Sequence, residues 1–392
     1  MKKKHLLLYL LVIFFQFGFG QYKQLSPDSE ISIITADSGK ALYEGFGHSA
    51  IRVKNSDFDL AYNYGIFDSS GSNFYVNFTK GKMLYKVMKY PFHYFVRSYN
   101  KDQRWIKEQV LNLTQEEKQQ FFNYLENNVK PENASYYYDP YFNNCATKIR
   151  HITDLILGDK VRFPENNKGA NKSFRNLMNK EIPWNTWGSF GINLALGSKL
   201  DAITTDKQKM YLPDYVYAGY KNATVKRNNV NEHLIKKEHT ILAFEDQKID
   251  IPFFSPFFVF FLIMNIGLFV TIKDIKKKRR TKWLDFFLFI TTGLLGLLVL
   301  FLWFFTDHST APNNFNSLWA FAPNLYIAFI LSKKGNRLWM KKYFQMLLLL
   351  LIITPIIWAL KIQELPLSII PLLLLLFVRY LALIKVLLPF KK

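Results

Sequence analysis

The chain holds one cysteine, Cys145, in the stretch DPYFNNCATKIRHITDLILG (139–158). A single thiol cannot form an internal disulfide, so Cys145 is either an inert buried side chain or a reactive nucleophile. Asn143 or Asn144 is a good helix N-cap, and the apolar spacing that follows predicts a helix ending at Gly158. The positive end of that helix dipole would lower the pKa of a thiol in the first turn. This position argues against a purely apolar pocket, although both alternatives stay open.

A cysteine nucleophile needs a base, and His48 is the best candidate among the histidines. It lies in GFGHSAIRV, where the glycines can bring backbone close to a site and the following strand would hold the imidazole rigidly. His151 is on the same predicted helix as Cys145 but points to another face, and His233 and His239 lie in a charged stretch expected to be a solvated connector. A structural histidine is the alternative for His48; as a base it would take the thiol proton.

Such a pair usually needs a third group that orients the imidazole. Tyr62 and Asn63 lie on the next predicted strand, and alternation allows only one of them to face the same side as His48. We favour Asn63 as the third catalytic residue and expect Tyr62 and Asn144 to contact the substrate. A zinc site is not expected, because one cysteine and scattered histidines supply no ligand cluster.

Local patterns predict the elements that would position these residues. Three strands are predicted, at ISIITA (31–36), SAIRVK (49–54) and DLAYNYGIF (59–67). Residues 55–57 suggest a hairpin turn between the last two strands. Thr114 and Glu117 form a capping box that starts a helix with an apolar face. Residues 21–250 are long enough for one α+β domain with its own core.

Both ends of the chain predict export and membrane insertion. The opening MKKKHLLLYLLVIFFQFGFGQ has the pattern of a secretory signal peptide, with cleavage expected near Gly20. Five apolar segments follow from about residue 253, and most reach the roughly 20 residues that span a bilayer. The third of them is the shortest and contains Asn316, Pro323 and Asn324. The five segments cover 253–272, 283–305, 315–331, 344–360 and 367–388.

The charge distribution orients these segments. The loops KDIKKKRRTK (273–282) and SKKGNRLWMKKY (332–343) are strongly basic, which predicts a cytoplasmic position for both and an external position for residues 21–250. Most of the net charge of +21 therefore reflects membrane topology, which removes the main support for a nucleic-acid-binding function. The predicted domains are a signal peptide (1–20), an external catalytic domain (21–250) and a membrane domain with five transmembrane helices (251–392).

Several stretches together resemble a known family. GHSAIRV, AYNYGIFD, NFYVNFTKGKMLY (73–85) and YFNNCATKIR resemble the extracytoplasmic domain of the Lnb family, lipoprotein N-acyltransferases of Gram-negative bacteria. The apolar tail, with TDHST and NNFNSLW before its third segment, is similar to the membrane part of that family. The order of histidine, polar residue and cysteine at a helix start also resembles the circularly permuted NlpC-like relatives of papain. These resemblances imply a permuted papain-like, NlpC-like periplasmic domain followed by an all-α bundle of five helices in the inner membrane.

The resemblance also implies an activity. Cys145 would be the nucleophile and His48 the base of an acyl transfer from a membrane phospholipid, through a thioester, to the α-amine of a diacylated lipoprotein, with no cofactor. Asp307, His308 and Asn316 lie on the same predicted side as the catalytic domain, so we expect them to orient a head group or relay the amine proton. Ordinary polarity at a membrane interface is the alternative for these three residues.

Two other function classes stay open. A membrane-anchored thiol hydrolase, cleaving a peptidoglycan peptide or a phospholipid, would use the same Cys145 and His48. A non-enzymatic scaffold or lipid-binding module would not need the thiol. The aromatic run at 136–142 is read as packing, although it could form one wall of an acyl-chain groove. Arg379, inside the last apolar segment, is expected to face the bundle or a lipid phosphate, or to snorkel to the interface.

Overall fold

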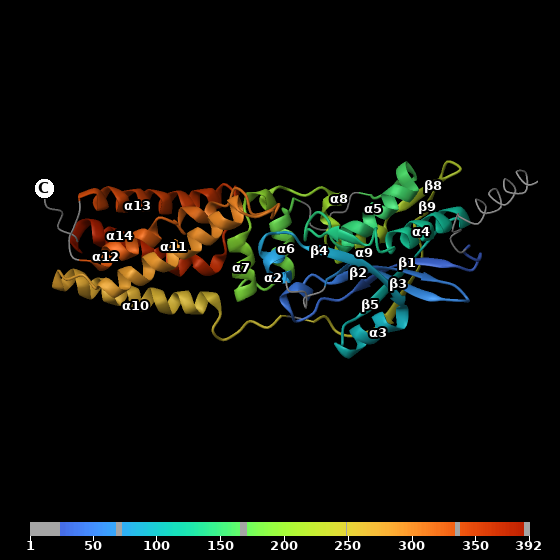
Figure 1. Cartoon of the computed structure of the whole chain (residues 1–392), viewed down its shortest axis with the longest axis horizontal. Coiled ribbons are helices and arrows are strands. Elements are labelled where there is room, and N and C mark those ends of the chain that lie inside the picture. The colour runs from blue at the N-terminus through green and yellow to red at the C-terminus, as the bar shows by residue number, and fades with distance from the viewer. Residues whose placement is uncertain (1–23, 68–72, 165–170, 248, 334–337, 388–392) are drawn as a thin grey trace, which may run out of the picture.

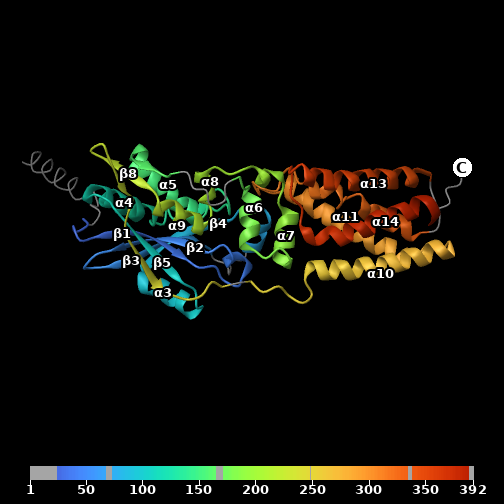
Figure 2. The ribbon, with the colours of Figure 1, turned by 180° about the vertical axis from the view of Figure 1, so that it is seen from behind.

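The computed structural model describes residues 24–67, 73–164, 171–247, 249–333 and 338–387. The chain forms an elongated molecule with a mixed α/β domain at one end and a bundle of helices at the other (Figure 1). Figure 2 shows the same division from behind. The predicted signal peptide lies outside the described residues.

A seven-stranded antiparallel sheet forms the centre of the α/β domain, in the order β10-β5-β1-β2-β3-β4-β6. The three strands predicted from alternation are confirmed as β1, β2 and β3. The Asn55 side chain accepts hydrogen bonds from the backbone of Asp57 and Phe58, which closes the predicted turn between β2 and β3. The strands are β1 (Glu30–Ala36), β2 (His48–Lys54), β3 (Asp59–Ile66), β4 (Leu84–Pro91), β5 (Ile106–Leu111), β6 (Ser135–Tyr137) and β10 (Ile235–Leu242).

The two faces of the sheet are covered by different helices because neighbouring side chains on each strand point to opposite sides. Ile33 and Ile51 lie in the large core beneath α4 (Gln115–Asn128), α5 (Cys145–Leu157) and α9 (Pro213–Lys221). Ile34 and Ala50 lie in a smaller core against α3 (Phe92–Lys101). The capping box predicted at Thr114 and Glu117 is present at the start of α4.

The charged stretch around His233 and His239 is not the solvated connector that its composition suggests. It forms β9 and β10, and β10 is an edge strand of the main sheet; both histidines are exposed there. Charged side chains are typical of edge strands, where they discourage pairing with other chains. A second, three-stranded sheet contains β7 (Val161–Arg162), β8 (Thr224–Arg227) and β9 (Val230–His233).

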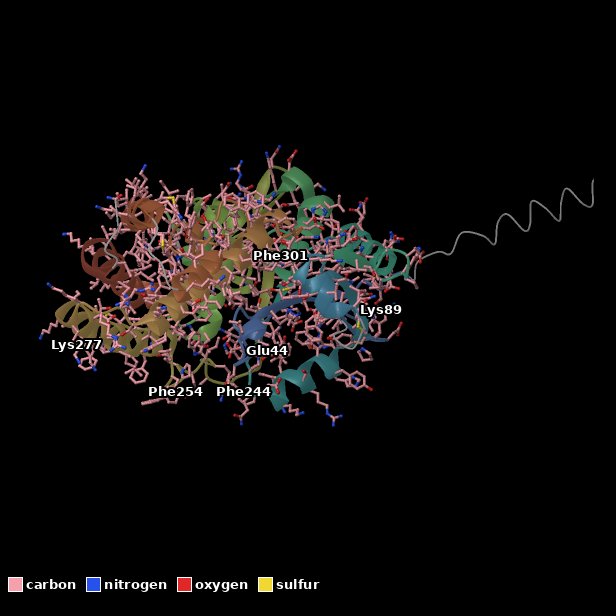
Figure 3. The ribbon with its side chains drawn as sticks, turned by 60° about the vertical axis from the view of Figure 1, so that its left-hand side comes forward. Glu44, Lys89, Phe244, Phe254, Lys277 and Phe301 are labelled. Atoms are coloured by element: carbon pink, nitrogen blue, oxygen red, sulfur yellow. The ribbon has the colours of Figure 1, made fainter. Side chains whose placement is uncertain are left out.

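The described residues contain four helices long and apolar enough to cross a membrane, so the expectation of five such segments needs correction. They are α10 (Pro256–Lys277), α11 (Lys282–Phe304), α13 (Leu338–Ala359, apolar span Trp339–Ala359) and the span Leu367–Lys385 around α14 (Ile370–Ala382). Figure 3 shows Phe254 and Lys277 near opposite ends of α10.

The third apolar segment is instead a broken element. A 3₁₀ turn, η4 (Phe315–Leu318), precedes the nine-residue helix α12 (Asn324–Ser332), which spans only about 14 Å. Its irregular backbone packs so closely on Gly293 and Gly296 of α11 that a Cβ at either glycine would collide with it. Asn324 donates to Thr292 and accepts from Tyr343. Non-helical backbone is tolerated at this depth because protein, not lipid, surrounds it.

Arg379 faces the interior of the bundle. Its guanidinium donates to Asp285 at 2.7 Å and to Asp274 at 2.9 Å, and its side chain is fully buried. These contacts join α10, α11 and α14. The sequence left three positions open for Arg379: facing the bundle, facing a lipid phosphate, or snorkelling to the interface. The structure shows the first.

A polar joint connects the two parts of the molecule. Arg175 of α6 (Phe174–Glu181) is buried and pairs with Asp201 at 3.0 Å, and the backbone N–H of Glu364 donates to the same carboxylate. Phe190 and Leu194 of α7 (Trp187–Ala195) belong to the hydrophobic core of the membrane helices. The remaining short elements are η1 (Leu42–Glu44), α2 (Phe74–Thr79), η2 (Gly158–Lys160), η3 (Ser198–Asp201), α8 (Asp206–Lys209), η5 (Leu367–Ile369) and η6 (Leu383–Leu387).

Candidate active site

Cys145 is the first residue of α5, and Asn144 is the N-cap that places it there. The Asn144 carboxamide accepts from the backbone N–H of Thr147, while the Thr147 hydroxyl accepts from the backbone N–H of Asn144. Asn144 also donates to the carbonyl groups of Pro140 and Tyr211 at 2.7 and 2.8 Å. Its side chain is therefore buried and engaged within the protein, and it positions the thiol rather than offering free atoms to a substrate.

His48 begins β2, and Asn63 lies beside it on β3. The two strands pair with Ile51 opposite Tyr62, so His48 and Asn63 share one face of the sheet. The imidazole Nε2 lies 2.6 Å from the Asn63 Oδ1. Asn63 in turn donates from Nδ2 to the Tyr90 hydroxyl at 2.8 Å, which fixes the direction of the carboxamide.

The structure brings His48 and Cys145 close enough together for each side chain to shift the pKa of the other. Because Asn63 accepts at Nε2, that nitrogen carries the proton in the neutral imidazole, and Nδ1 remains for the thiol. The ring of Phe95 stacks on the imidazole with centroids 6.3 Å apart. Tyr90, Asn63, His48 and Cys145 thus form one relay held by three strands, β4, β3 and β2, and by the start of α5.

The electrostatics of the pair favour a thiolate and an imidazolium. Burial opposes both charges, but the charge and hydrogen bond of His48, with the backbone N–H groups of Ser49 and Ala146, lower the pKa of Cys145. For the imidazole, burial is likewise the largest opposing effect, and Cys145 and Asn63 outweigh it and raise the pKa of His48. A cysteine in this state is an activated nucleophile.

Two tyrosines from the segment before α5 interact electrostatically with the thiol. Tyr136 and Tyr138 both lie close enough to Cys145 for their charges to interact, and burial raises the pKa of each phenol, so both stay protonated. The Tyr136 hydroxyl is buried, and the described part of the chain offers it no partner of normal hydrogen-bond geometry. Tyr90 was not identified from the sequence, because it depends on strand β4, and Tyr136 was read only as part of the aromatic run at 136–142.

Tyr62 is not brought to this site. It lies on the opposite face of the sheet, fully buried, and its hydroxyl donates to Glu126 at 2.5 Å. Alternation along β3 explains this, since a strand that turns Asn63 toward His48 must turn Tyr62 into the large core. His151 on α5 is exposed, as the helical spacing predicts.

The three expected membrane-side residues lie in the connection after α11. The backbone N–H of Asp307 donates to the Lys80 carbonyl at 2.8 Å, and His308 forms a hydrogen bond with Thr306. Burial lowers the pKa of His308. Asn316 is fully buried. Its side-chain amide donates a hydrogen bond to the Asn193 carbonyl and accepts one from the Trp319 indole, so it lies in the joint and away from solvent.

The site faces the membrane domain. The Ser309 hydroxyl donates to Asp139, which lies six residues before Cys145. Lys199 donates to the Ser309 carbonyl at 3.2 Å and stands over the ring of Phe142. The segment that leads into Cys145 is therefore bound directly to the outer connection of the bundle. Among the described residues, no group of three or more His, Cys, Asp or Glu side chains could hold a metal ion.

Comparison with protein-family models gives two matches. Residues 20–180 match the Lnb N-terminal periplasmic domain, and residues 246–389 match the Lnb transmembrane domain. No curated protein and no solved structure matches the chain.

Proposed function

The chain belongs to the Lnb family, with its periplasmic domain and its transmembrane domain in order, and from this premise we propose that it is a lipoprotein N-acyltransferase. The family places the α/β domain in the periplasm and the helices in the bacterial inner membrane. The observation that carries the proposal is the activated pair of Cys145 and His48, together with the hydrogen bond that holds the segment before Cys145 to the connection after α11.

In the first step, the Cys145 thiolate attacks an ester carbonyl of a phospholipid, and a sulfur–carbon bond forms. The backbone N–H of Cys145, in the first turn of α5, and the Tyr136 hydroxyl are the donors that we assign to the oxyanion. As the ester carbon–oxygen bond breaks, the leaving oxygen takes the proton from Nδ1 of His48. A lysophospholipid departs, and the acyl chain remains on the enzyme as a thioester.

In the second step, the neutral α-amine of the diacylated lipoprotein attacks the thioester. The carbon–sulfur bond breaks, the amine proton passes to His48, and the thiolate and imidazolium are restored. Asn63 keeps the imidazole oriented through both steps, since its contact at Nε2 leaves Nδ1 toward the reacting atoms. The order of His48, Asn63 and Cys145 along the chain is the one expected of a permuted papain-like enzyme.

The burial of the thiol supports transfer over hydrolysis. Cys145 is 7% exposed and belongs to the large core, against which Tyr136 packs. A thioester in such surroundings is shielded from water until the amine arrives. A thiol hydrolase would use the same pair and remains the alternative that the following experiment separates.

The test is mass spectrometry of the N-terminal peptide of a reporter lipoprotein, in a strain depleted of its own N-acyltransferase. The strain carries wild type, Cys145→Ala, His48→Ala or the matched control His151→Ala, which changes an exposed histidine on α5. We expect a third acyl chain with wild type and the control, and a diacylated peptide with the other two. A diacylated peptide and free fatty acid with wild type would contradict the transferase.

A further inference from the structure

The short helix α2, with the sequence FYVNFT, exposes an apolar surface. None of its residues is buried, and Tyr75, Val76 and Phe78 are 73%, 50% and 48% exposed. Tyr43 and Phe67 extend this surface: their rings are 6.4 Å apart, and Phe67 stacks on Phe74 of α2 at 5.5 Å. We call Tyr43, Phe67, Tyr75, Val76 and Phe78 the α2 surface. Contiguous exposed apolar residues of this kind mark an interaction site.

The α2 surface lies at the height of the outer membrane interface. The carbonyl of Lys80, directly after α2, accepts from the backbone of Asp307, and α11 ends at Phe304. The 23 residues of α11 cover about 34 Å, enough to cross the hydrocarbon core. Phe304 and Phe305 are 64% and 74% exposed, so lipid-facing aromatic residues of the bundle continue toward α2.

Gly81 allows the backbone after α2 to lie this close to the connection after α11. Its φ of +77° suits glycine, and a Cβ there would lie 2.6 Å from the backbone nitrogen of His308. The backbone after α2 therefore rests directly on the connection that leaves the membrane.

A continuous series of rings leads from the α2 surface to the thiol. Phe67 packs on Tyr85 with centroids 5.0 Å apart, and Tyr85 packs on Tyr138 at 4.5 Å. Tyr138 precedes Cys145 by seven residues in the chain and interacts with it electrostatically. Exposure falls from 39% for Phe67 to 9% for Tyr85, and Tyr138 is half-buried. These rings form one apolar wall between the bilayer and the nucleophile.

The charges around α2 favour a phospholipid over the lipoprotein. Lys80 and Lys82 are exposed directly after α2, and only Lys82 lies near a carboxylate, that of Asp307 at 3.8 Å, among the ion pairs seen in the described residues. Such a cluster attracts a lipid phosphate, whereas it repels the α-ammonium group at the N-terminus of a lipoprotein.

We propose that the α2 surface is the entry site for the acyl donor. It takes an acyl chain of a phospholipid from the outer leaflet of the inner membrane, while the lysines hold the phosphate, and the ring series guides the ester toward Cys145. The inference rests on the proposed function for what happens at the thiol, but lipid binding by the surface can be tested without any catalysis.

The binding test uses full-length Cys145→Ala protein in vesicles of phosphatidylethanolamine and phosphatidylglycerol with a reporter lipoprotein. A photoreactive benzoylphenylalanine replaces Tyr75 or, as control, Tyr94, a tyrosine 55% exposed on α3, which lies away from the bundle (Figure 1). We expect a phospholipid adduct at position 75 and none at 94. No adduct at 75, equal adducts at both positions, or preferential capture of the lipoprotein would overturn the proposal.

The delivery test compares Tyr75→Ser/Phe78→Ser with Tyr94→Ser/Leu155→Ser, which removes two side chains of similar exposure elsewhere. Acylation of Cys145 by vesicle phospholipid should fall about tenfold only in the first variant, as expected when apolar contact with a chain is lost. The initial burst of p-nitrophenol, released when soluble p-nitrophenyl acetate acylates Cys145, should be equal in both variants. Equal acylation by phospholipid in the two variants contradicts the entry site.

Failure of the proposed function would look different. If wild type forms no acyl-enzyme from phospholipid while position 75 still yields the lipid adduct, the transferase is contradicted and the lipid-binding surface is supported.

Discussion

At the scale of single residues, the reactivity of the site depends on charge stabilisation inside a buried setting. Burial alone would keep both Cys145 and His48 neutral, and the mutual attraction of the pair reverses this. Asn63 contributes from the other side of the ring, and its own direction depends on Tyr90. Each of these contacts therefore has a measurable effect on a pKa.

We expect Cys145 to react with iodoacetamide at pH values below the ordinary thiol pKa of about 8.5. In His48→Ala the imidazolium is lost, burial dominates, and the apparent pKa of the thiol should rise. The whole-protein mass reports this thiol alone, because the chain has one cysteine. An unchanged profile in His48→Ala, with His151→Ala as control, would show that His48 does not activate the thiol.

The acylation rate should fall at high pH, where His48 loses the proton that the leaving oxygen needs. The Asn63 hydrogen bond raises the pKa of His48, so Asn63→Ala should move this alkaline limb to lower pH. Asn63→Asp adds a negative charge and should move it to higher pH. The measurement is the pH dependence of acyl-enzyme formation. If the alkaline limb moved in the same direction in both variants, the hydrogen bond assigned between Asn63 and His48 would be contradicted.

At the scale of elements, the caps and strands decide where the reacting groups meet. The capping box of Asn144 and Thr147 at α5 resembles that of Thr114 and Glu117 at α4, but only the first holds a reacting group. The two helices therefore offer a matched comparison between stability and function.

Replacing either cap with alanine should cost about 0.5–2 kcal/mol of stability. Asn144→Ala should in addition displace Cys145 from His48 and raise the apparent pKa of the thiol, whereas Thr114→Ala should leave that pKa unchanged. Thermal unfolding and alkylation profiles of both variants provide the check. A thiol pKa that moves equally in both would mean that Asn144 acts only through general stability.

Sequence patterns predict local features of this fold well and distant contacts poorly. The strands β1, β2 and β3, the cap at Asn144 and the end of α5 at Gly158 follow from neighbouring residues. The shared face of His48 and Asn63 follows from alternation once the hairpin is known. The role of Tyr90 and the position of β10 do not follow from neighbouring residues, because both depend on pairing with strands far away in the chain.

The third apolar segment shows a different limit. Hydropathy counts apolar side chains, and by that measure the segment resembles its neighbours. What breaks it is the close approach of backbone to Gly293 and Gly296, together with the polar contacts of Asn324 to Thr292 and Tyr343. Asn316, expected at the head-group level, is buried in the joint for a similar reason: its partners include Asn193 of α7 and Trp319, directly after η4.

At the scale of the whole molecule, the two domains share a core and a buried polar joint. Phe190 and Leu194 of α7 pack with the membrane helices, and Arg175 binds Asp201 beside the backbone of Glu364. The periplasmic domain is thereby fixed against the bundle, and Ser309 of the connection after α11 binds Asp139 in the segment before Cys145.

Arg175→Met would leave the Asp201 carboxylate buried without its cation, which typically costs about 3–5 kcal/mol. The matched control is Lys207→Met, because Lys207 forms an exposed pair with Asp154 at 2.6 Å that is worth at most about 1 kcal/mol. Thermal unfolding of the full chain in detergent should show a much lower midpoint for Arg175→Met than for the control. Equal midpoints would mean that the joint does not stabilise the molecule.

The position of β10 in the chain has a consequence for biosynthesis. This last strand of the main sheet ends at Leu242, before the first membrane helix begins at Pro256. When the chain is exported from its N-terminus, every strand of the sheet has therefore crossed the translocation channel before α10 enters the lipid. Phe190 and Leu194, in contrast, find their partners only after the later helices insert. The sheet can form early, and the joint must close last, so α7 is the segment most exposed to chaperones and proteases during assembly.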